Sequence, residues 1–295
     1  MQEKDEWYFL VCPLCQGHLE KHSSSEFICN SHGSFPILSD IPSFILSPCH
    51  EFEKHWKEYK SSRIPSKKIE GAQNFLYPLL KNVLDNEKKI LCLDAGCGDG
   101  VHNEVLTTQT SLIDLVNLDI SFNALLSSKR RTMKKRKFIH GDLSELPIAD
   151  NTFDCVFSFG VLAYTNNPFQ AFQELCRVTA HEGLIGIWVA PKHKGFLGLM
   201  FSLIRTLSKW GGSFIQKVIA NLLVPFLWLL PIASRVNLSN ASWEECKEVI
   251  LVNIAPSSLY FPDITEIEKW FDTCEIQIIK DSNTYLFGTV WGKKH

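Results

Sequence analysis

The stretch ILCLDAGCGDG, residues 90–100, places an apolar, strand-like run directly before three glycines at alternate positions. Glycines in such a turn let a ligand approach the backbone and the amide groups that open the following helix. The spacing Gly-x-Gly-x-Gly differs from the Gly-x-Gly-x-x-Gly of dinucleotide enzymes, and no Gly-Lys-Ser/Thr follows for a nucleoside triphosphate. The turn therefore indicates a nucleotide-like ligand without identifying it.

Short apolar runs recur along the chain after this turn, separated by segments of helical length. The runs are KILCLD, LVNLD, KFIHGD, FDCVFS and GLIGIWVA. Between the last two, NPFQAFQELCRVTA carries its apolar residues near the spacing of one helical face. The alternation of strand and helix predicts an α/β fold with a doubly wound, mostly parallel sheet.

Two acidic residues follow the second and third of these strand-like segments. Asp119 in VNLDIS can accept both hydroxyls of a ribose, and Asp142 in HGDLSELP can accept an adenine amino group at the same sheet edge. Each acid alone is more often a loop cap. Together with the glycine turn, in this order, they favour a ligand that carries a nucleoside.

Residues 88–190 resemble the class I S-adenosylmethionine-dependent methyltransferases, in the small-molecule and quinone-biosynthesis branch with the methyltransferase type 11 domain. ILCLDAGCGDG resembles the first motif of that family, VNLDIS the second, and the sequence from HGDLSELP to GLIGIWV its later motifs. The resemblance implies a Rossmann-like sheet of seven strands whose last strand is antiparallel. EIQIIKDSNTYLFGTVWG, residues 275–292, would supply the final hairpin around Asp-Ser-Asn.

The same resemblance implies that S-adenosylmethionine binds at the carboxyl edge of the sheet. The residues that it implies are Asp94, Gly96, Cys97 and Gly98 around the methionine moiety, Asp119 at the ribose, Asp142 and Leu143 at the adenine, and Phe159 on the sulfonium side. Cys97 stands between glycines, so we interpret it as part of the turn and not as a nucleophile.

No catalytic residue follows from the sequence. The methyl group of a sulfonium is already activated, so orientation can supply most of the acceleration, and a base is needed only for a weakly acidic acceptor. Relatives in this branch usually have two histidines where this chain has Ala163 and Tyr164. Tyr164 could orient a substrate or only line the pocket rim, and His193 could contact the substrate or be a solvated loop residue.

A second motif lies near the N-terminus. CPLC at 12–15 and CNSH at 29–32 give Cys-x2-Cys and Cys-x2-His, which suit a structural, tetrahedral Zn²⁺ held by Cys12, Cys15, Cys29 and His32. The surrounding sequence resembles the small zinc-ribbon family that includes the activator subunit of tRNA and protein methyltransferases, where the fourth ligand is usually Cys. The alternative is a ribbon fold that has lost its metal.

Residues 196–260 are rich in apolar side chains, as in VIANLLVPFLWLLPIA. The uninterrupted apolar core is about a dozen residues, shorter than the roughly 20 that span a bilayer, and Pro225 interrupts it. We therefore predict a helical lid over an acceptor pocket and not a transmembrane helix. An apolar acceptor fits this lid, and peripheral contact with a membrane is a further interpretation.

The basic run SSKRRTMKKRK, residues 127–137, could contact phosphates, although such a run is more often a solvated helix and loop. It supports an alternative function, an rRNA or tRNA base methyltransferase that uses the ribbon and the run for RNA. A second alternative is a non-catalytic adaptor that binds the cofactor. The intact glycine turn and both acids argue against the adaptor.

Composition sets the remaining expectations. The chain has 295 residues, 45% of them hydrophobic, and a net charge of −2, which gives no general attraction to nucleic acid or anionic membrane. The start, MQEKDEWYFLVCPLC, has no positive region before a long apolar run, so we expect no signal peptide and a cytoplasmic protein. We expect a ribbon-like unit at 1–45, a linker at 46–70, and a methyltransferase domain at 71–295 with the lid at 196–260.

Overall fold

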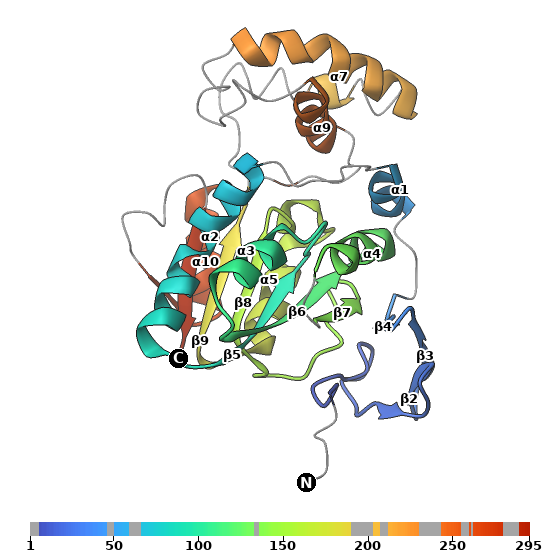
Figure 1. The fold of residues 1–295 in the computed structure, drawn as a ribbon, viewed down its shortest axis with the longest axis vertical. Helices are drawn as coiled ribbons and strands as arrows, with labels where there is room; N and C mark the ends of the chain where they lie inside the picture. Colours follow the sequence, from blue (N-terminus) through green and yellow to red (C-terminus); the bar gives the residue numbers. More distant parts are fainter. Residues whose placement is uncertain are drawn as a thin grey trace. The chain divides into compact units, whose positions relative to one another are not determined.

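The computed structural model describes residues 6–45, 50–58, 66–132, 136–189, 203–206, 212–229, 243–254, 260, 262–279 and 289–295. The chain divides into two compact units, one formed by residues 1–190 and 262–295 and the other by residues 191–261 (Figure 1).

A seven-stranded sheet forms the centre of the first unit. Its strands are β5 (Ile90–Ala95), β6 (Ile113–Asp119), β7 (Lys137–His140), β8 (Phe153–Phe159), β9 (Thr179–Trp188), β10 (Ile276–Ile278) and β11 (Thr289–Lys294). They lie in the order β10-β11-β9-β8-β5-β6-β7, and β11 is antiparallel to both neighbours while β5 to β9 pair in parallel. The predicted doubly wound sheet with an antiparallel last strand is confirmed. The Asp-Ser-Asn turn of the predicted hairpin lies outside the described residues.

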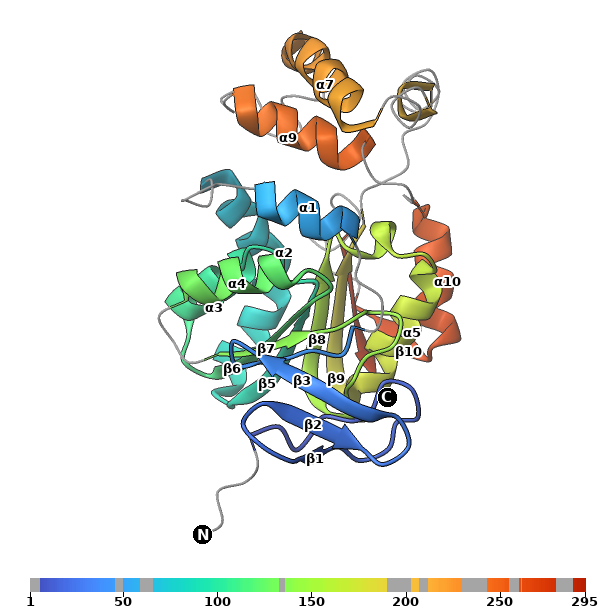
Figure 2. The ribbon, with the colours of Figure 1, turned by 90° about the vertical axis from the view of Figure 1, so that its right-hand side faces the viewer.

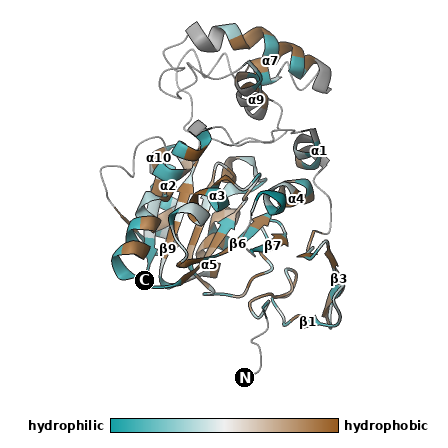
Figure 3. Cartoon of the chain, viewed as in Figure 1, coloured by the Kyte–Doolittle hydropathy of each residue, from teal (hydrophilic) through white to brown (hydrophobic). Residues whose placement is uncertain are grey.

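Helices cover both faces of this sheet (Figure 2). On one side lie α2 (Ser66–Asn86), α3 (Val101–Gln109) and α4 (Phe122–Arg131), and on the other α5 (Pro168–Val178) and α10 (Ile264–Thr273). Leu76 and Leu79 of α2 pack with Trp291 of β11 in a continuous apolar core. On the opposite face, the rings of Phe172 and Phe271 join α5 to α10, with centroids 4.8 Å apart. Figure 3 shows the apolar character of the central strands.

The strand ends explain why this topology can hold a ligand. Because β5, β6 and β7 are parallel, their carboxyl ends meet at one edge, where Asp94 is in register with Asn117 and Asp119 with His140. The crossover from β6 continues into α4, whose first turn is capped by the Ser121 hydroxyl, which accepts a hydrogen bond from the Ala124 N–H at 3.3 Å. Sequence-distant acidic residues are thereby fixed at one edge.

The N-terminal residues form a small antiparallel sheet of β1 (Glu20–Lys21), β2 (Glu26–Cys29), β3 (Gly33–Leu38) and β4 (Ile41–Pro42). It attaches to the β7 edge of the large sheet. Ser43 forms a parallel bridge with His140, and the Phe44 N–H donates to the His140 carbonyl at 2.8 Å. The Ser43 hydroxyl also lies 2.7 Å from Nδ1 of His140. The small sheet is thus joined to the strand that precedes Asp142.

The segment between the two sheets, predicted as a linker at 46–70, contains a packed helix. Residues His50–Glu58 form helix α1, which packs on α4. The reason lies in its pattern: Phe52 and Trp56 are four residues apart, so both aromatic rings lie on the same side of a helix. α2 then begins at Ser66.

The second unit contains α7 (Gly212–Leu229) and α9 (Trp243–Ile254). Ala220 and Val224 of α7 and Cys246 and Ile250 of α9 are buried together between the two helices. No helix among the described residues is both long enough and apolar enough to cross a bilayer.

Candidate functional sites

The glycine turn after β5 is held by backbone hydrogen bonds to the end of β6. The N–H groups of Gly96 and Cys97 donate to the Leu118 carbonyl at 2.7 and 3.0 Å. Gly96 has a φ of 87°, and a Cβ at this position would lie 2.4 Å from Cγ2 of Val161. Only glycine fits there, because a side chain would meet both backbone strain and a clash. Cys97 is buried, and burial raises the pKa of its thiol well above the ordinary value, so it is no nucleophile.

Asp119 closes the turn from the side of β6. Its Oδ2 accepts a hydrogen bond from the Gly98 N–H at 2.9 Å, and its Oδ1 accepts one from the Ser121 N–H at 2.8 Å. Each oxygen keeps a further lone pair that can accept from a ligand hydroxyl. Burial is the main reason that the pKa of Asp119 is raised to about 6.

Asp94 forms a buried pair with a histidine that the sequence reasoning did not single out. Its Oδ2 lies 3.0 Å from Nδ1 of His102, in the first turn of α3, and both side chains are almost fully buried. Asp94 Oδ1 has no hydrogen-bond partner among the described residues. A buried carboxylate oxygen of this kind is suited to accept from a cationic ammonium group. The sequence offered no signal for this pair beyond one histidine two residues after a glycine turn.

The remaining predicted cofactor residues surround the same edge. Asp142 follows β7, where its Oδ1 accepts from the Ser144 N–H at 2.8 Å, and Leu143 is buried beside it. The Phe159 ring stacks on Trp188 with centroids 4.8 Å apart and lies 5.3 Å from the His102 ring. Phe159 therefore lies next to the Asp94 end of the edge.

Helix α1 adds contacts to this edge that the sequence did not predict. The Glu53 carboxylate accepts hydrogen bonds from the N–H of Phe122 and the side-chain amide of Asn123, at the start of α4. The Trp56 ring comes within 3.0 Å of where a Cβ on Gly98 would lie. The Phe52 ring meets Tyr164 edge to face at 6.1 Å. α1 thus contacts the glycine turn, α4 and Tyr164, while His193 lies outside the described residues.

These groups fit S-adenosylmethionine in their donor and acceptor chemistry. The free Oδ1 of Asp94 matches an ammonium group, and the remaining lone pairs of Asp119 match two adjacent hydroxyls. Between these two carboxylates, Gly96 and Gly98 carry no side chain and Cys97 is buried, while the Trp56 ring lies against Gly98.

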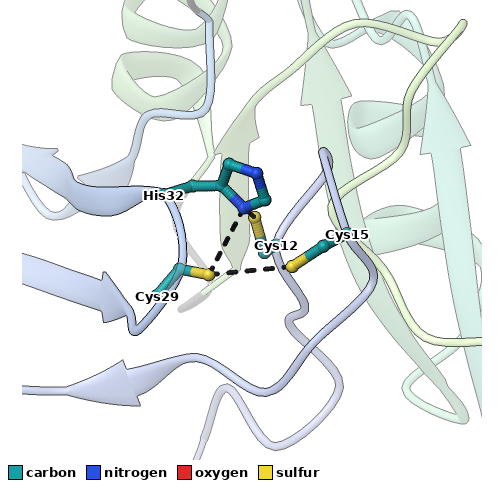
Figure 4. Close-up of side chains that lie close together, drawn as sticks. All are labelled: Cys12, Cys15, Cys29 and His32. Atoms are coloured by element: carbon teal, nitrogen blue, oxygen red, sulfur yellow. Dashed lines mark hydrogen bonds between the residues drawn. The ribbon is translucent and has the colours of Figure 1, made fainter.

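The four predicted metal ligands come together in the small sheet. Their ligand atoms all lie within 4.8 Å of one another. Cys12 Sγ is 3.5 Å and Cys29 Sγ 3.7 Å from Nδ1 of His32, and the sulfurs of Cys15 and Cys29 are 3.8 Å apart (Figure 4). A tetrahedral Zn²⁺ at its usual bond lengths separates two sulfurs by about 3.8 Å and a sulfur from a nitrogen by about 3.6 Å. These three distances match the separations expected in a tetrahedral zinc site, and the donor set of three thiols and one imidazole suits zinc.

The pKa of the Cys29 thiol is lowered, which favours its ionised form. The backbone N–H of Ser31 is the main reason that the pKa of Cys29 is lowered to about 6, and His32 contributes in the same direction. The thiolate is the form that binds metal.

A model of the family described as "Methyltransferase domain" matches residues 93–187, from the end of β5 to the end of β9. Residues 93–187 form a class I S-adenosylmethionine-dependent methyltransferase domain. The match begins at Leu93 in β5, just before the glycine turn, and includes Asp119, Asp142 and Phe159.

Three curated relatives resemble this methyltransferase domain. A malonyl-[acyl-carrier protein] O-methyltransferase of Buchnera aphidicola is 35% identical over 107 residues, which are 36% of this chain and 42% of the relative. A demethylmenaquinone methyltransferase of Renibacterium salmoninarum is 41% identical over 92 residues, 31% of this chain and 37% of the relative. A sterol 24-C-methyltransferase of Schizosaccharomyces pombe is 31% identical over 116 residues, 35% of this chain and 31% of the relative. The chain spans less than half the length of each of these relatives.

Proposed function

We propose that this protein is a methyltransferase that uses S-adenosylmethionine to methylate a small, apolar acceptor. The observation that carries the proposal is the pair of carboxylates, Asp94 and Asp119, placed on either side of a turn in which Gly96 tolerates no side chain. In this proposal the cofactor residues are Asp94, Gly96, Cys97, Gly98, Asp119, Asp142, Leu143 and Phe159.

In this mechanism the residues of the chain bind the cofactor and orient the acceptor. The bound sulfonium supplies an activated methyl group, so in-line placement of the acceptor provides most of the acceleration. Phe159, stacked on Trp188 and packed against Phe75 at 4.7 Å, supplies a rigid apolar wall beside Asp94. With Ala163 and Tyr164 at the neighbouring turn, the chain offers a phenol there to position an acceptor.

The apolar acceptor is supported by chemistry from two sources. Two of the three relatives described above carry the names of lipophilic acceptors, a sterol and demethylmenaquinone. Residues 196–260, which we propose as the lid, belong to the helical unit, and their described part has exposed apolar side chains.

The structure gives the RNA alternative less support than the basic run gave it in the sequence, because several of these basic residues are already paired. Lys129 pairs with Asp40 at 3.2 Å, Arg131 with Asp99 at 3.2 Å, and Lys137 with Asp114 at 3.7 Å. Arg136 donates to the Ile113 carbonyl at 2.8 Å. Charges that are already paired within the chain contribute less to phosphate binding, because each pair must first be broken.

The Cys12, Cys15, Cys29 and His32 cluster supports a structural Zn²⁺. Four protein ligands complete a tetrahedral shell and leave no position for substrate. We propose that the metal stabilises the small sheet that is joined to His140 and takes no part in methyl transfer.

The experiment is methyl transfer from methyl-labelled S-adenosylmethionine to a panel of a demethylated quinone, a sterol, a malonyl thioester and transfer RNA. Asp119→Ala should reduce transfer at subsaturating cofactor by about 10- to 100-fold, because the ribose hydroxyls lose their acceptor. Asp114→Ala, at the opposite end of β6, is the matched control and should retain activity. Labelling of RNA alone would replace the apolar acceptor in this proposal, and equal loss in both variants would remove Asp119 from the site.

A further inference from the structure

Helix α7 has two apolar faces, and α9 covers only one of them. Ala220 and Val224 are buried against α9, with Ile219 and Leu223 packed beside them. Ile215, Val218 and Leu222 are 41%, 41% and 65% exposed. Their spacing of three and four residues places these three side chains on one strip of the helix, which we call the α7 strip.

Charge in this part of the sequence has one sign. Between Glu182 and Glu244 the sequence contains no Asp or Glu, but it contains six basic residues: Lys192, Lys194, Arg205, Lys209, Lys217 and Arg235. The whole chain has 30 Lys and Arg against 32 Asp and Glu, so outside this stretch acids exceed bases by eight. In the sequence, the stretch that contains the α7 strip therefore has a net positive charge, while the rest of the chain is net acidic.

Aromatic residues accompany this charge. Trp243, at the start of α9, is 40% exposed, and its indole N–H donates to the side-chain oxygen of Asn221 on α7 at 3.0 Å. Tryptophan with a partnered N–H and an exposed ring is favoured where an apolar phase meets water. Figure 3 shows apolar and polar residues alternating along the described part of α7.

We propose that the helical unit binds the surface of an anionic lipid bilayer, with the α7 strip inserted at the boundary between headgroups and acyl chains. An apolar helix face, a net basic sequence around it and an exposed tryptophan together match the chemistry of that surface, and the acidic residues of this unit are confined to α9. α7 lies in the plane of the bilayer, in keeping with the absence of a spanning helix among the described residues. The inference does not require methyl transfer, although it would place the enzyme where apolar acceptors are dissolved.

The test is co-sedimentation of the full chain with vesicles of phosphatidylcholine, alone or with about 30% phosphatidylglycerol. We expect partition into the anionic vesicles, weakened but not abolished at about 0.5 M NaCl. Val218→Asn combined with Leu222→Asn should lower the partition coefficient by about tenfold or more, because two inserted side chains become polar. The matched control is Tyr77→Asn with Leu84→Asn, two exposed apolar residues of α2 that should leave partition unchanged.

Three results would overturn the proposal. The first is no sedimentation of the folded wild-type chain with anionic vesicles. The second is equal binding by the strip variant and the wild type, which would mean adsorption by charge alone. The third is a dimer in sedimentation velocity that the strip variant converts to a monomer, without vesicle binding, which would mean that a second copy covers the strip.

Discussion

Asp119 fixes the glycine turn through Gly98, and in the proposed function its remaining lone pairs also accept hydrogen bonds from the ligand. Its burial makes ionisation unfavourable, and the pKa rises from 3.8 to about 6. The ionised form costs the folded state free energy, so this side chain favours folding most below its unfolded pKa, and that contribution is lost as the pH rises through about 6. Ligand binding should depend on pH in the opposite direction.

We expect affinity for S-adenosylhomocysteine to be highest above pH 7 and to fall by up to about tenfold per pH unit below the pKa of Asp119. The reason is that protonation removes acceptor capacity from the carboxylate. Calorimetric titrations between about pH 7.5 and 5.5 measure the effect. Asp119→Asn, which cannot titrate, should bind weakly with a flat profile, and the same pH dependence in that variant would assign the titration to another group.

A substitution at Gly96 tests whether the turn needs a residue without a side chain, because Val161 lies close to it. Gly96→Ala would place a Cβ 2.4 Å from Val161, whereas Gly33→Ala, at a similar φ of 80°, meets no atom within 4 Å. Both variants incur the cost of a left-handed backbone, about 1 kcal/mol, but only Gly96→Ala adds a clash and should lose about 1–3 kcal/mol more. Urea unfolding measures both, and equal losses would show that Val161 yields to the added methyl group.

At the scale of elements, the small N-terminal sheet depends on its four ligands. One zinc per chain is expected by elemental analysis, and Cys12→Ser should reduce zinc content and make the N-terminal residues more sensitive to protease. Cys274→Ser, outside the cluster, is the control and should keep the metal. A wild-type chain that is free of zinc, yet as protease-resistant as after zinc addition, would contradict the site.

The elements also show what local sequence patterns can and cannot predict. The apolar runs predicted β5 to β9 because buried parallel strands need continuous apolar residues. Helix α1 was interpreted as a polar connector, since its mean composition is hydrophilic and only Phe52 and Trp56 mark its packed face. The Asp94–His102 pair and the Ser43–His140 bridge join residues through tertiary packing. Asp94 stands in a recognisable motif, but nothing in the local pattern of His102, Ser43 or His140 predicts these partners.

At the scale of the whole molecule, the sheet order brings Asp94, Asp119 and Asp142 from three separate strands to one edge. The four cluster ligands could be predicted because metal sites have fixed ligand spacing. The methyl acceptor could not be predicted from the sequence, because the residues that would select it belong to segments without such a motif.

The central claim is that this edge binds S-adenosylmethionine, and calorimetry of the full chain with S-adenosylhomocysteine tests it most directly. We predict one binding site per chain, with affinity weakened by about 1–3 kcal/mol in Asp119→Ala and unchanged in Asp114→Ala. Absence of binding to a chain that circular dichroism shows to be folded would contradict it.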